Sequence, residues 1–145
     1  MKAIRLERPY RKLAVKSYVR AFFDYPMLTY YWPDPDLRAR WLERQLLCNI
    51  DYGLRYGEVY TTPDFAGVSV WLPPGQTQVT TWRCIKVGGG ALPFLMGIKH
   101  YLTRVTKEED LVREAQEEIV PGPHWYLWGL GVDPDRQGEG LGTAL

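Results

Sequence analysis

Three alternating glycines near the end of the chain, Gly138, Gly140 and Gly142, most strongly constrain how it can fold. They follow an apolar stretch at 124–132 that has the character of a strand, and they lead into residues 141–145, which begin a helix. A strand that ends in such a turn presents backbone N–H groups to one point, where the helix dipole adds roughly half a positive charge. Because glycines lack the Cβ atoms that would keep a phosphate away, the stretch predicts a pyrophosphate site.

Two familiar glycine motifs fit this stretch poorly. A P-loop requires a lysine before its serine or threonine, and no lysine precedes Thr143. A dinucleotide-binding fold places its glycine turn after the first strand, whereas this turn follows the fourth predicted strand. Arg136 adds a cation that suits a phosphate. The remaining alternative is a loop whose glycines serve only tight helix packing.

Residue periodicity along the rest of the chain predicts a mixed α/β domain. The expected order is an edge strand at 2–7, a helix at 11–23, an aromatic-rich loop at 27–32, a helix capped by Asp34 or Asp36 and ending at Tyr56, two strands within 58–74, a mostly helical insert at about 79–119, and a strand at 124–132. In the second helix Leu42, Leu46, Ile50 and Leu54 form one apolar stripe, with Arg38 off it.

Composition and charge narrow the class of protein. The length of 145 residues predicts a single domain, 1–145. The chain has 18 basic and 17 acidic residues and no block of like charge, so we expect neither a nucleic-acid nor a membrane partner. Cys48 and Cys84 fit no metal spacing and no disulfide framework, so we expect no metal and a reducing, cytoplasmic location. Trp71, Trp125 and Trp128 are expected in the core.

The glycine turn resembles a known family motif. Gln137-x-x-Gly140-x-Gly142, entered from residues 130–134, is similar to the acetyl-CoA pyrophosphate signature of the GCN5-related N-acetyltransferases. Stretches 21–26, 33–36, 67–74 and 124–138 resemble the branch of that family that includes puromycin N-acetyltransferase. The likeness runs from about residue 20 to the end, and the insert at 79–119 matches poorly. It implies the acyl-CoA N-acyltransferase fold, a mixed, mostly antiparallel sheet flanked by helices.

The resemblance implies a chemistry and a cofactor site. The expected reaction transfers the acetyl group of acetyl-CoA, the co-substrate, to the amine of a small molecule by direct attack in a ternary complex. Pyrophosphate would bind the amides of the turn, and pantetheine would pair with the end of the preceding strand, where a backbone N–H near Leu130 would polarise the thioester carbonyl. The expected cofactor-binding residues are Leu130, Val132, Arg136, Gln137, Gly138, Gly140, Gly142 and Thr143.

The family forms a substrate wall from the segment between its first two helices. The residues expected there are Asp24, Tyr25, Tyr30, Tyr31 and Trp32. An aspartate among aromatic rings suits a cationic amine, and an equal alternative is that the rings pack under the loop while Asp24 caps a turn. No residue of this chain is identified as general base. The general-acid tyrosine of the family would lie beyond Leu145.

The family continues past the turn with the rest of a helix, a fifth strand, a further helix and usually two more strands, roughly 40 residues by mean element lengths. We therefore expect a domain that is incomplete at its C-terminus, either a fragment or one completed by strand exchange in a homodimer. One alternative function is a truncated or non-catalytic acyl-CoA-binding module. The other is a nucleotide-binding regulator that prefers ATP or NAD to CoA.

Overall fold

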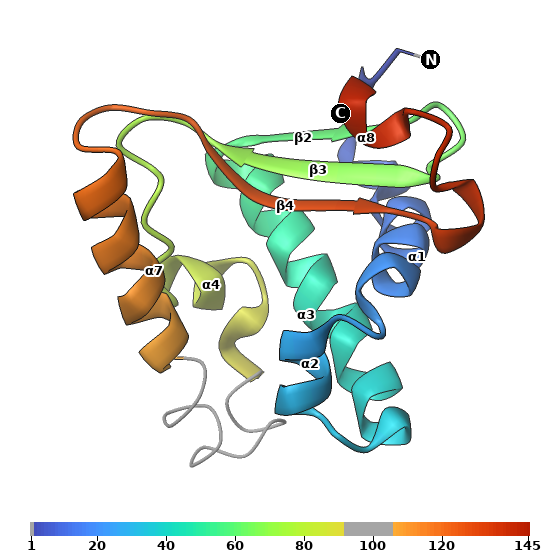
Figure 1. Ribbon diagram of the computed structural model, residues 1–145, viewed down its shortest axis with the longest axis horizontal. Helices are drawn as coiled ribbons and strands as arrows, with labels where there is room; N and C mark the ends of the chain where they lie inside the picture. Colours follow the sequence, from blue (N-terminus) through green and yellow to red (C-terminus); the bar gives the residue numbers. More distant parts are fainter. Residues whose placement is uncertain (1, 92–105) are drawn as a thin grey trace.

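The computed structural model describes residues 2–91 and 106–145 (Figure 1). The helices and strands, in chain order, are β1 Ile4–Arg5, η1 Arg8–Tyr10, α1 Arg11–Phe22, α2 Pro26–Tyr31, α3 Pro35–Tyr56, β2 Glu58–Thr61, β3 Gly67–Leu72, α4 Thr81–Lys86, η2 Gly89–Ala91, α7 Thr106–Ile119, β4 Tyr126–Val132, η4 Pro134–Arg136 and α8 Leu141–Ala144. This is the predicted mixed α/β order.

The four strands form one antiparallel sheet in the order β1-β2-β3-β4. The register pairs Tyr60 with Ser69 and Ser69 with Leu130. The predicted pair of strands within 58–74 and the strand at 124–132 are confirmed. The predicted edge strand at 2–7 is present but shorter, because only Ile4 and Arg5 pair with β2.

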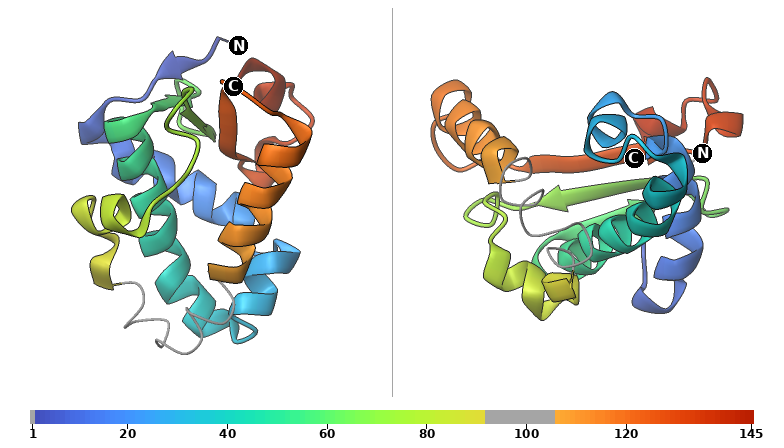
Figure 2. Two further views of the ribbon diagram at one scale, coloured as in Figure 1. Left: turned by 90° about the vertical axis from the view of Figure 1, so that its left-hand side faces the viewer. Right: turned by 90° about the horizontal axis from the view of Figure 1, so that it is seen from below.

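Helices cover both faces of the sheet. Helices α1 and α3 lie on one face and the short α8 lies on the other (Figures 1 and 2). Val68 and Val70 of β3 point toward α1 and α3 and are fully buried, whereas Ser69 turns to the α8 face, where its hydroxyl donates to the Leu145 carbonyl at 3.2 Å. Each buried core side chain of this size contributes about 1.5–3 kcal/mol, so the main core lies between the sheet and the two long helices.

Helix α3 begins and ends as predicted. The Asp34 carboxylate accepts hydrogen bonds from the backbone N–H groups of Asp36 (2.8 Å) and Leu37 (3.3 Å), and the helix runs to Tyr56, followed by Gly57. The stripe residues Leu42, Leu46 and Ile50 are buried in the main core, and Leu54 packs against it, so the apolar face of this helix is confirmed.

Two local predictions are wrong. The aromatic segment predicted as a loop forms the helix α2. Pro26 occupies the first turn of this helix, where the missing N–H of proline costs no hydrogen bond. Arg38 does not lie on a solvent-facing side of α3: it is 6% exposed, its guanidinium donates to the Trp32 carbonyl at 2.7 Å, and it stacks on the Phe23 ring at 4.7 Å. Arg38 lies four residues before Leu42, so its position continues the apolar stripe, and only its charge argued against burial.

The described part of the insert is mostly helical, as predicted, through α4, η2 and α7. Its residues 92–105 lie outside the described part of the chain. Across residues 2–91 and 106–145, no helix combines the length and apolar character needed to cross a membrane. Within those same ranges, no three His, Cys, Asp or Glu side chains group in a way that could hold a metal ion.

Candidate functional site

The glycine turn connects the end of β4 to the start of α8. After Val132 the chain makes the single 3-10 turn η4 and then passes through Gly138 and Gly140, whose φ angles are 84° and 75°. Side chains other than glycine rarely adopt such left-handed angles. A Cβ added to either glycine would meet no atom within 4 Å. The turn therefore needs glycine for its backbone path, and its surface is open to an approaching group.

Gly142 lies in the first turn of α8 and differs from the other two glycines. Its φ is not left-handed, and an added Cβ would have Val132 Cγ2 as its nearest neighbour, at an ordinary contact distance of 3.8 Å. The fold therefore has room for alanine at this position. Thr143, the next residue, is exposed on the same short helix.

Several contacts hold the turn against the rest of the sheet and against α1. The Gln137 side-chain amide donates to the Val132 carbonyl at 3.2 Å, and the Asp133 N–H donates to the Ala66 carbonyl at 2.8 Å. The Arg20 guanidinium of α1 lies 2.5 Å from the Asp135 carboxylate and 3.3 Å from that of Asp133. These bonds fix the path of the chain before it reaches the glycines.

Arg136, predicted as a phosphate ligand, is occupied by two carboxylates. It forms a bidentate pair with Glu139, with both bonds 2.8 Å long, and a third bond of 2.6 Å to Asp64. Glu139 and Asp64 raise the pKa of Arg136. Contact with phosphate stays a prediction, and it would use the two guanidinium N–H groups that these three bonds leave. The sequence analysis missed both partners, and only Glu139, three positions away, lay near enough to be inferred.

The backbone of β4 has one paired and one open edge. Because the Asp133 N–H points toward the β3 side, and alternate residues of a strand share a direction, the backbone groups of Leu130 and Val132 point toward the other edge. That edge has no neighbouring strand in the described sheet.

Strand β4 also contains a bulge. The register shifts between Val70 and Trp71, so Trp128 has no paired residue in β3. Such bulges often lie beside active sites.

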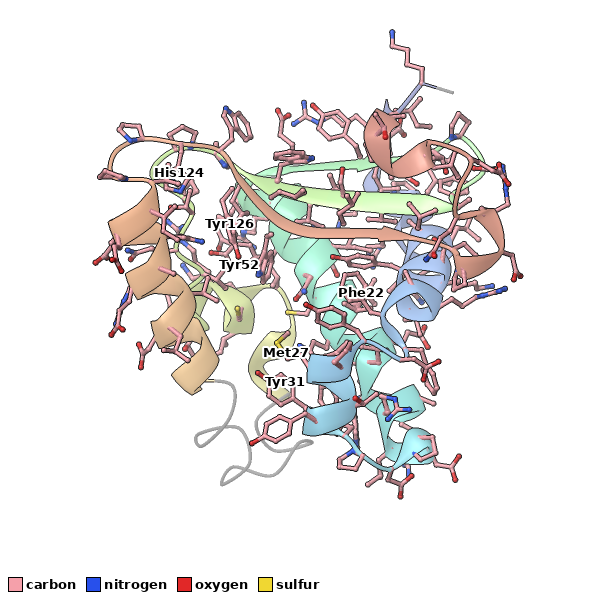
Figure 3. The ribbon with its side chains drawn as sticks, in the orientation of Figure 1. Phe22, Met27, Tyr31, Tyr52, His124 and Tyr126 are labelled. Carbon is pink, nitrogen blue, oxygen red and sulfur yellow. The ribbon has the colours of Figure 1, made fainter. Side chains whose placement is uncertain are left out.

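The residues predicted as the acceptor wall separate into exposed and buried groups. Asp24, Tyr25 and Tyr30 are exposed around the start and end of α2. The Asp24 carboxylate, whose side chain is 86% exposed, lies 3.6 Å from Arg38, which partly compensates its charge. Tyr31 and Trp32 are buried in the core, as the packing alternative expected. Figure 3 shows Tyr31 and Met27 on the side of α2 that faces the middle of the molecule.

The tryptophans predicted to lie in the core differ from one another. Trp128 packs against the core, with its ring 5.2 Å from that of Tyr52, so this prediction is confirmed. Trp125 is 51% exposed in the segment before β4, so its assignment to the core is wrong. It precedes the strand, outside the antiparallel pairing with β3.

The chain is similar to known acetyltransferases in sequence and in structure. An uncharacterized N-acetyltransferase of Schizosaccharomyces pombe is 27% identical over 154 residues, which covers 97% of this chain and 59% of that protein. The crystal structure of a histone acetyltransferase HPA2 and related acetyltransferase from Corynebacterium glutamicum superposes with a TM-score of 0.66 at 18% identity, over 99% of this chain and 66% of that one. No protein-family model matches the sequence.

These comparisons agree with the observed architecture. At 18% identity the structural likeness concerns the fold, and the sequence relative carries the name of an N-acetyltransferase. The chain spans about three fifths to two thirds of the length of these two proteins. The predicted fold class is confirmed: the chain has the α/β fold of an acetyltransferase structure, with an antiparallel sheet flanked by helices.

Proposed function

We propose that this chain is the acetyl-CoA-binding part of a GCN5-related N-acetyltransferase that acetylates the amine of a small molecule. The observation that carries the proposal is the turn between β4 and α8. There, two left-handed glycines leave an open surface at a helix start, on the fold of an acetyltransferase. The puromycin N-acetyltransferase-like branch, a cytoplasmic location and a homodimer remain predictions from the sequence.

In this proposal the two parts of the cofactor use two parts of β4 and its turn. The pyrophosphate binds the amides from Gln137 to Gly142. The pantetheine arm adds to the open edge of β4, where it meets the outward backbone groups of Leu130 and the N–H of Val132. The Val132 carbonyl already accepts a hydrogen bond from the Gln137 side chain. It is therefore less available to pantetheine than the backbone groups of Leu130.

The reaction joins the amine nitrogen to the thioester carbonyl carbon and breaks the carbon–sulfur bond. The amine loses one proton and the departing thiolate gains one. A backbone N–H at Leu130 would stabilise the negative charge on the carbonyl oxygen, a contribution of about 3 kcal/mol in other enzymes. Asp24, Tyr25 and Tyr30 are the acceptor-side residues that remain accessible, with the charge of Asp24 reduced by Arg38.

The test is calorimetric titration of the chain with acetyl-CoA, using a matched pair of variants. Gly140→Asp places a carboxylate where phosphate should lie, and we expect affinity at least about fivefold weaker because like charges repel at close range. Gly75→Asp is the control, since Gly75 has nearly the same φ, 77°, and equally open space. Both variants should lose similar stability, about 1 kcal/mol, from the left-handed angle.

Equal loss of acetyl-CoA binding in both variants, or none in either, would contradict the proposed pyrophosphate site. An acetyl-transfer assay over a panel of small amines then separates the two functional classes. Turnover of any amine in the panel supports the proposed N-acetyltransferase activity. Binding without turnover by the full-length protein supports the alternative, a non-catalytic acyl-CoA-binding module.

A further inference from the structure

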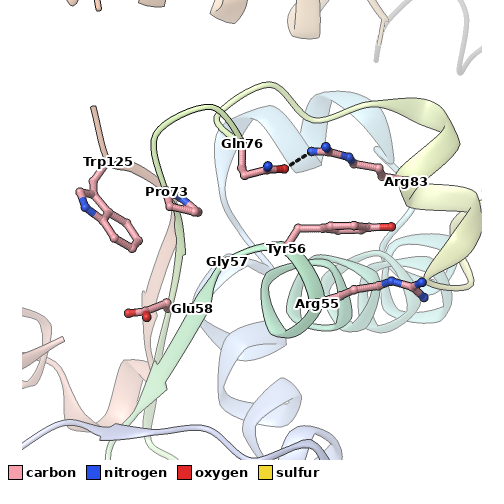
Figure 4. A pocket seen from close by; sticks show the side chains of 8 residues that line it. All are labelled: Arg55, Tyr56, Gly57, Glu58, Pro73, Gln76, Arg83 and Trp125. Carbon is pink, nitrogen blue, oxygen red and sulfur yellow. Dashed lines mark hydrogen bonds between the residues drawn. The ribbon is translucent and has the colours of Figure 1, made fainter. Parts of the chain in front are cut away.

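A concave site lies at the opposite end of β4 from the glycine turn. It is a cavity of about 430 Å³, within the range of small-molecule sites, and we name it the Tyr56 pocket. It forms where α3 passes into β2, beside the segment after β3 and the segment before β4 (Figure 4). The residues that matter to its chemistry are Arg55, Tyr56, Glu58, Gln76, Arg83 and Trp125.

Two arginines stack on one tyrosine ring in this pocket. The guanidinium carbon of Arg83 lies 4.9 Å from the centre of the Tyr56 ring, and that of Arg55 lies 5.6 Å from it. Figure 4 shows the ring between the two guanidinium groups. The cation–π attraction holds each guanidinium near the ring while leaving its N–H groups available to other partners. The two cations are therefore oriented before any ligand arrives.

Neither arginine is neutralised by the protein in the part of the chain that the structure describes. Across residues 2–91 and 106–145, no carboxylate lies within 4.0 Å of Arg55 or Arg83. Arg83 donates to the neutral Gln76 side chain, and its proximity opposes the rise in the pKa of Tyr52 that burial causes. A guanidinium has five donors, so Gln76 leaves most of them for a ligand.

The acidic residue of the pocket is already compensated. The Glu58 carboxylate lies 3.3 Å from the Arg5 guanidinium and accepts a hydrogen bond of 2.6 Å from the Tyr60 hydroxyl. Its charge therefore does not cancel those of the two arginines. The net electrostatic character of the Tyr56 pocket is positive, which favours an oxyanion.

The other side of the pocket offers an apolar plane. Figure 4 shows Trp125 and Pro73 on one side and the two guanidinium groups on the other. The Trp125 side chain is half exposed, so its ring can stack on a flat group of a ligand. We propose that the Tyr56 pocket binds a small molecule that carries a carboxylate or a phosphate beside a planar ring, with the anion on Arg83, the charge of Arg55 adding to the positive field, and the planar ring against Trp125. This site does not depend on the proposed acetyl transfer.

The experiment is a ¹H–¹⁵N NMR titration with three probes: benzoate, phenyl phosphate and the uncharged benzyl alcohol. We expect saturable shifts of the Trp125 indole N–H and the Arg83 side-chain N–H with at least one anion, and none with the alcohol. The relative affinity of benzoate and phenyl phosphate identifies which oxyanion the site prefers. Arg83→Gln should weaken binding about tenfold, since it removes a charged hydrogen-bond donor, and Arg55→Gln should weaken it less, since it removes only a nearby charge.

Arg40→Gln is the matched control, because Arg40 makes a similar stacking contact, 5.7 Å from the Trp41 ring, outside the pocket. Its affinity for the probes should equal that of the wild type. Unchanged signals of the other indoles establish that each variant is folded, and Arg83→Lys, which keeps the charge, should retain part of the binding. Equal shifts with benzyl alcohol, equal loss in Arg40→Gln, or no saturable shift with either anion would overturn the proposal.

Discussion

At the scale of residues, the charges around the glycine turn are already balanced by protein partners. Arg136 is shared between Glu139 and Asp64, and Arg20 between Asp133 and Asp135. A pyrophosphate that approached the turn would meet backbone amides directly, and at Arg136 it would meet a cation whose charge two carboxylates already compensate. The open glycine backbone therefore supports anion binding more directly than the arginine does.

Asp64 provides a pH-dependent test of this arrangement. A hydrogen bond from the Thr62 hydroxyl and the contact with Arg136 lower the pKa of Asp64 from 3.8 to about 2. A depressed carboxyl pKa means that the stabilisation is complete above the unfolded value, 3.8, and is lost as the pH falls through about 2. Because the Asp64 side chain is 40% exposed, we expect this stabilisation to be below about 1 kcal/mol.

The measurement is urea unfolding of the wild type and Asp64→Asn over the interval from pH 4 to pH 2, beside an NMR titration of the Asp64 carboxyl carbon. The wild type should lose more unfolding free energy in this interval than the variant does. An Asp64 titration centred near the ordinary aspartate value would contradict the observed pairing with Thr62 and Arg136.

At the scale of elements, the close approach of α1 to β4 depends on two strand glycines. A Cβ on Gly129 would overlap the Tyr18 hydroxyl, and one on Gly131 would lie 2.8 Å from the Tyr18 ring and 2.9 Å from the Phe22 ring. The rings of Tyr18 and Phe22 meet edge to face, with centroids 5.1 Å apart. These glycines thus allow aromatic side chains of α1 to pack directly on the strand that carries the candidate site.

Gly129→Ala should therefore destabilise the fold, by about 1–3 kcal/mol, because the added methyl overpacks the contact between α1 and β4. The double variant Tyr18→Phe/Gly129→Ala should recover part of the loss, since the nearest atom then becomes the ring carbon Cζ at 3.2 Å. Urea denaturation of the four proteins in this double-mutant cycle gives the coupling. Gly142→Ala, with its nearest contact at 3.8 Å, is the neutral control. Additive losses at positions 18 and 129 would contradict the contact.

At the scale of the whole molecule, the helices differ in how firmly they join the core. Helix α3 buries Leu42, Leu46 and Ile50, whereas Leu111 and Ile119 of α7 are 66% and 75% exposed. Figure 1 shows α7 at the side of the molecule, away from α1. A helix that buries little apolar surface opens at lower free energy than one that forms the core.

We expect the backbone amides of α7 from 113 to 119 to exchange with solvent faster than those of α3 from 42 to 53. Native-state hydrogen exchange followed by NMR checks this, since α3 should exchange only through global unfolding and α7 through local opening. Comparable protection of both helices, with the same dependence on denaturant, would show that α7 belongs to the cooperative core.

The sequence alone was sufficient for the elements with a clear period and a clear end. Helices α1 and α3 and strands β2 to β4 were predictable, because each repeats its apolar residues at the spacing of its own backbone, and the turn was predictable from its glycines. Caps and breaks such as Asp34 and Gly57 are also local. The short α2 was not predictable in this way, since its six residues, which begin with Pro26, contain no full amphipathic period.

The tertiary structure decided everything that depends on pairs of residues far apart in the chain. Asp64 and Arg136 are separated by 72 positions, and the buried Arg38 is stabilised by Phe23 and Trp32, which the fold brings against it. The Tyr56 pocket likewise draws its walls from α3, α4 and the segment before β4. Local periodicity predicts which face of an element is buried. A charge pair or a cavity forms only when folding brings residues from different elements close together.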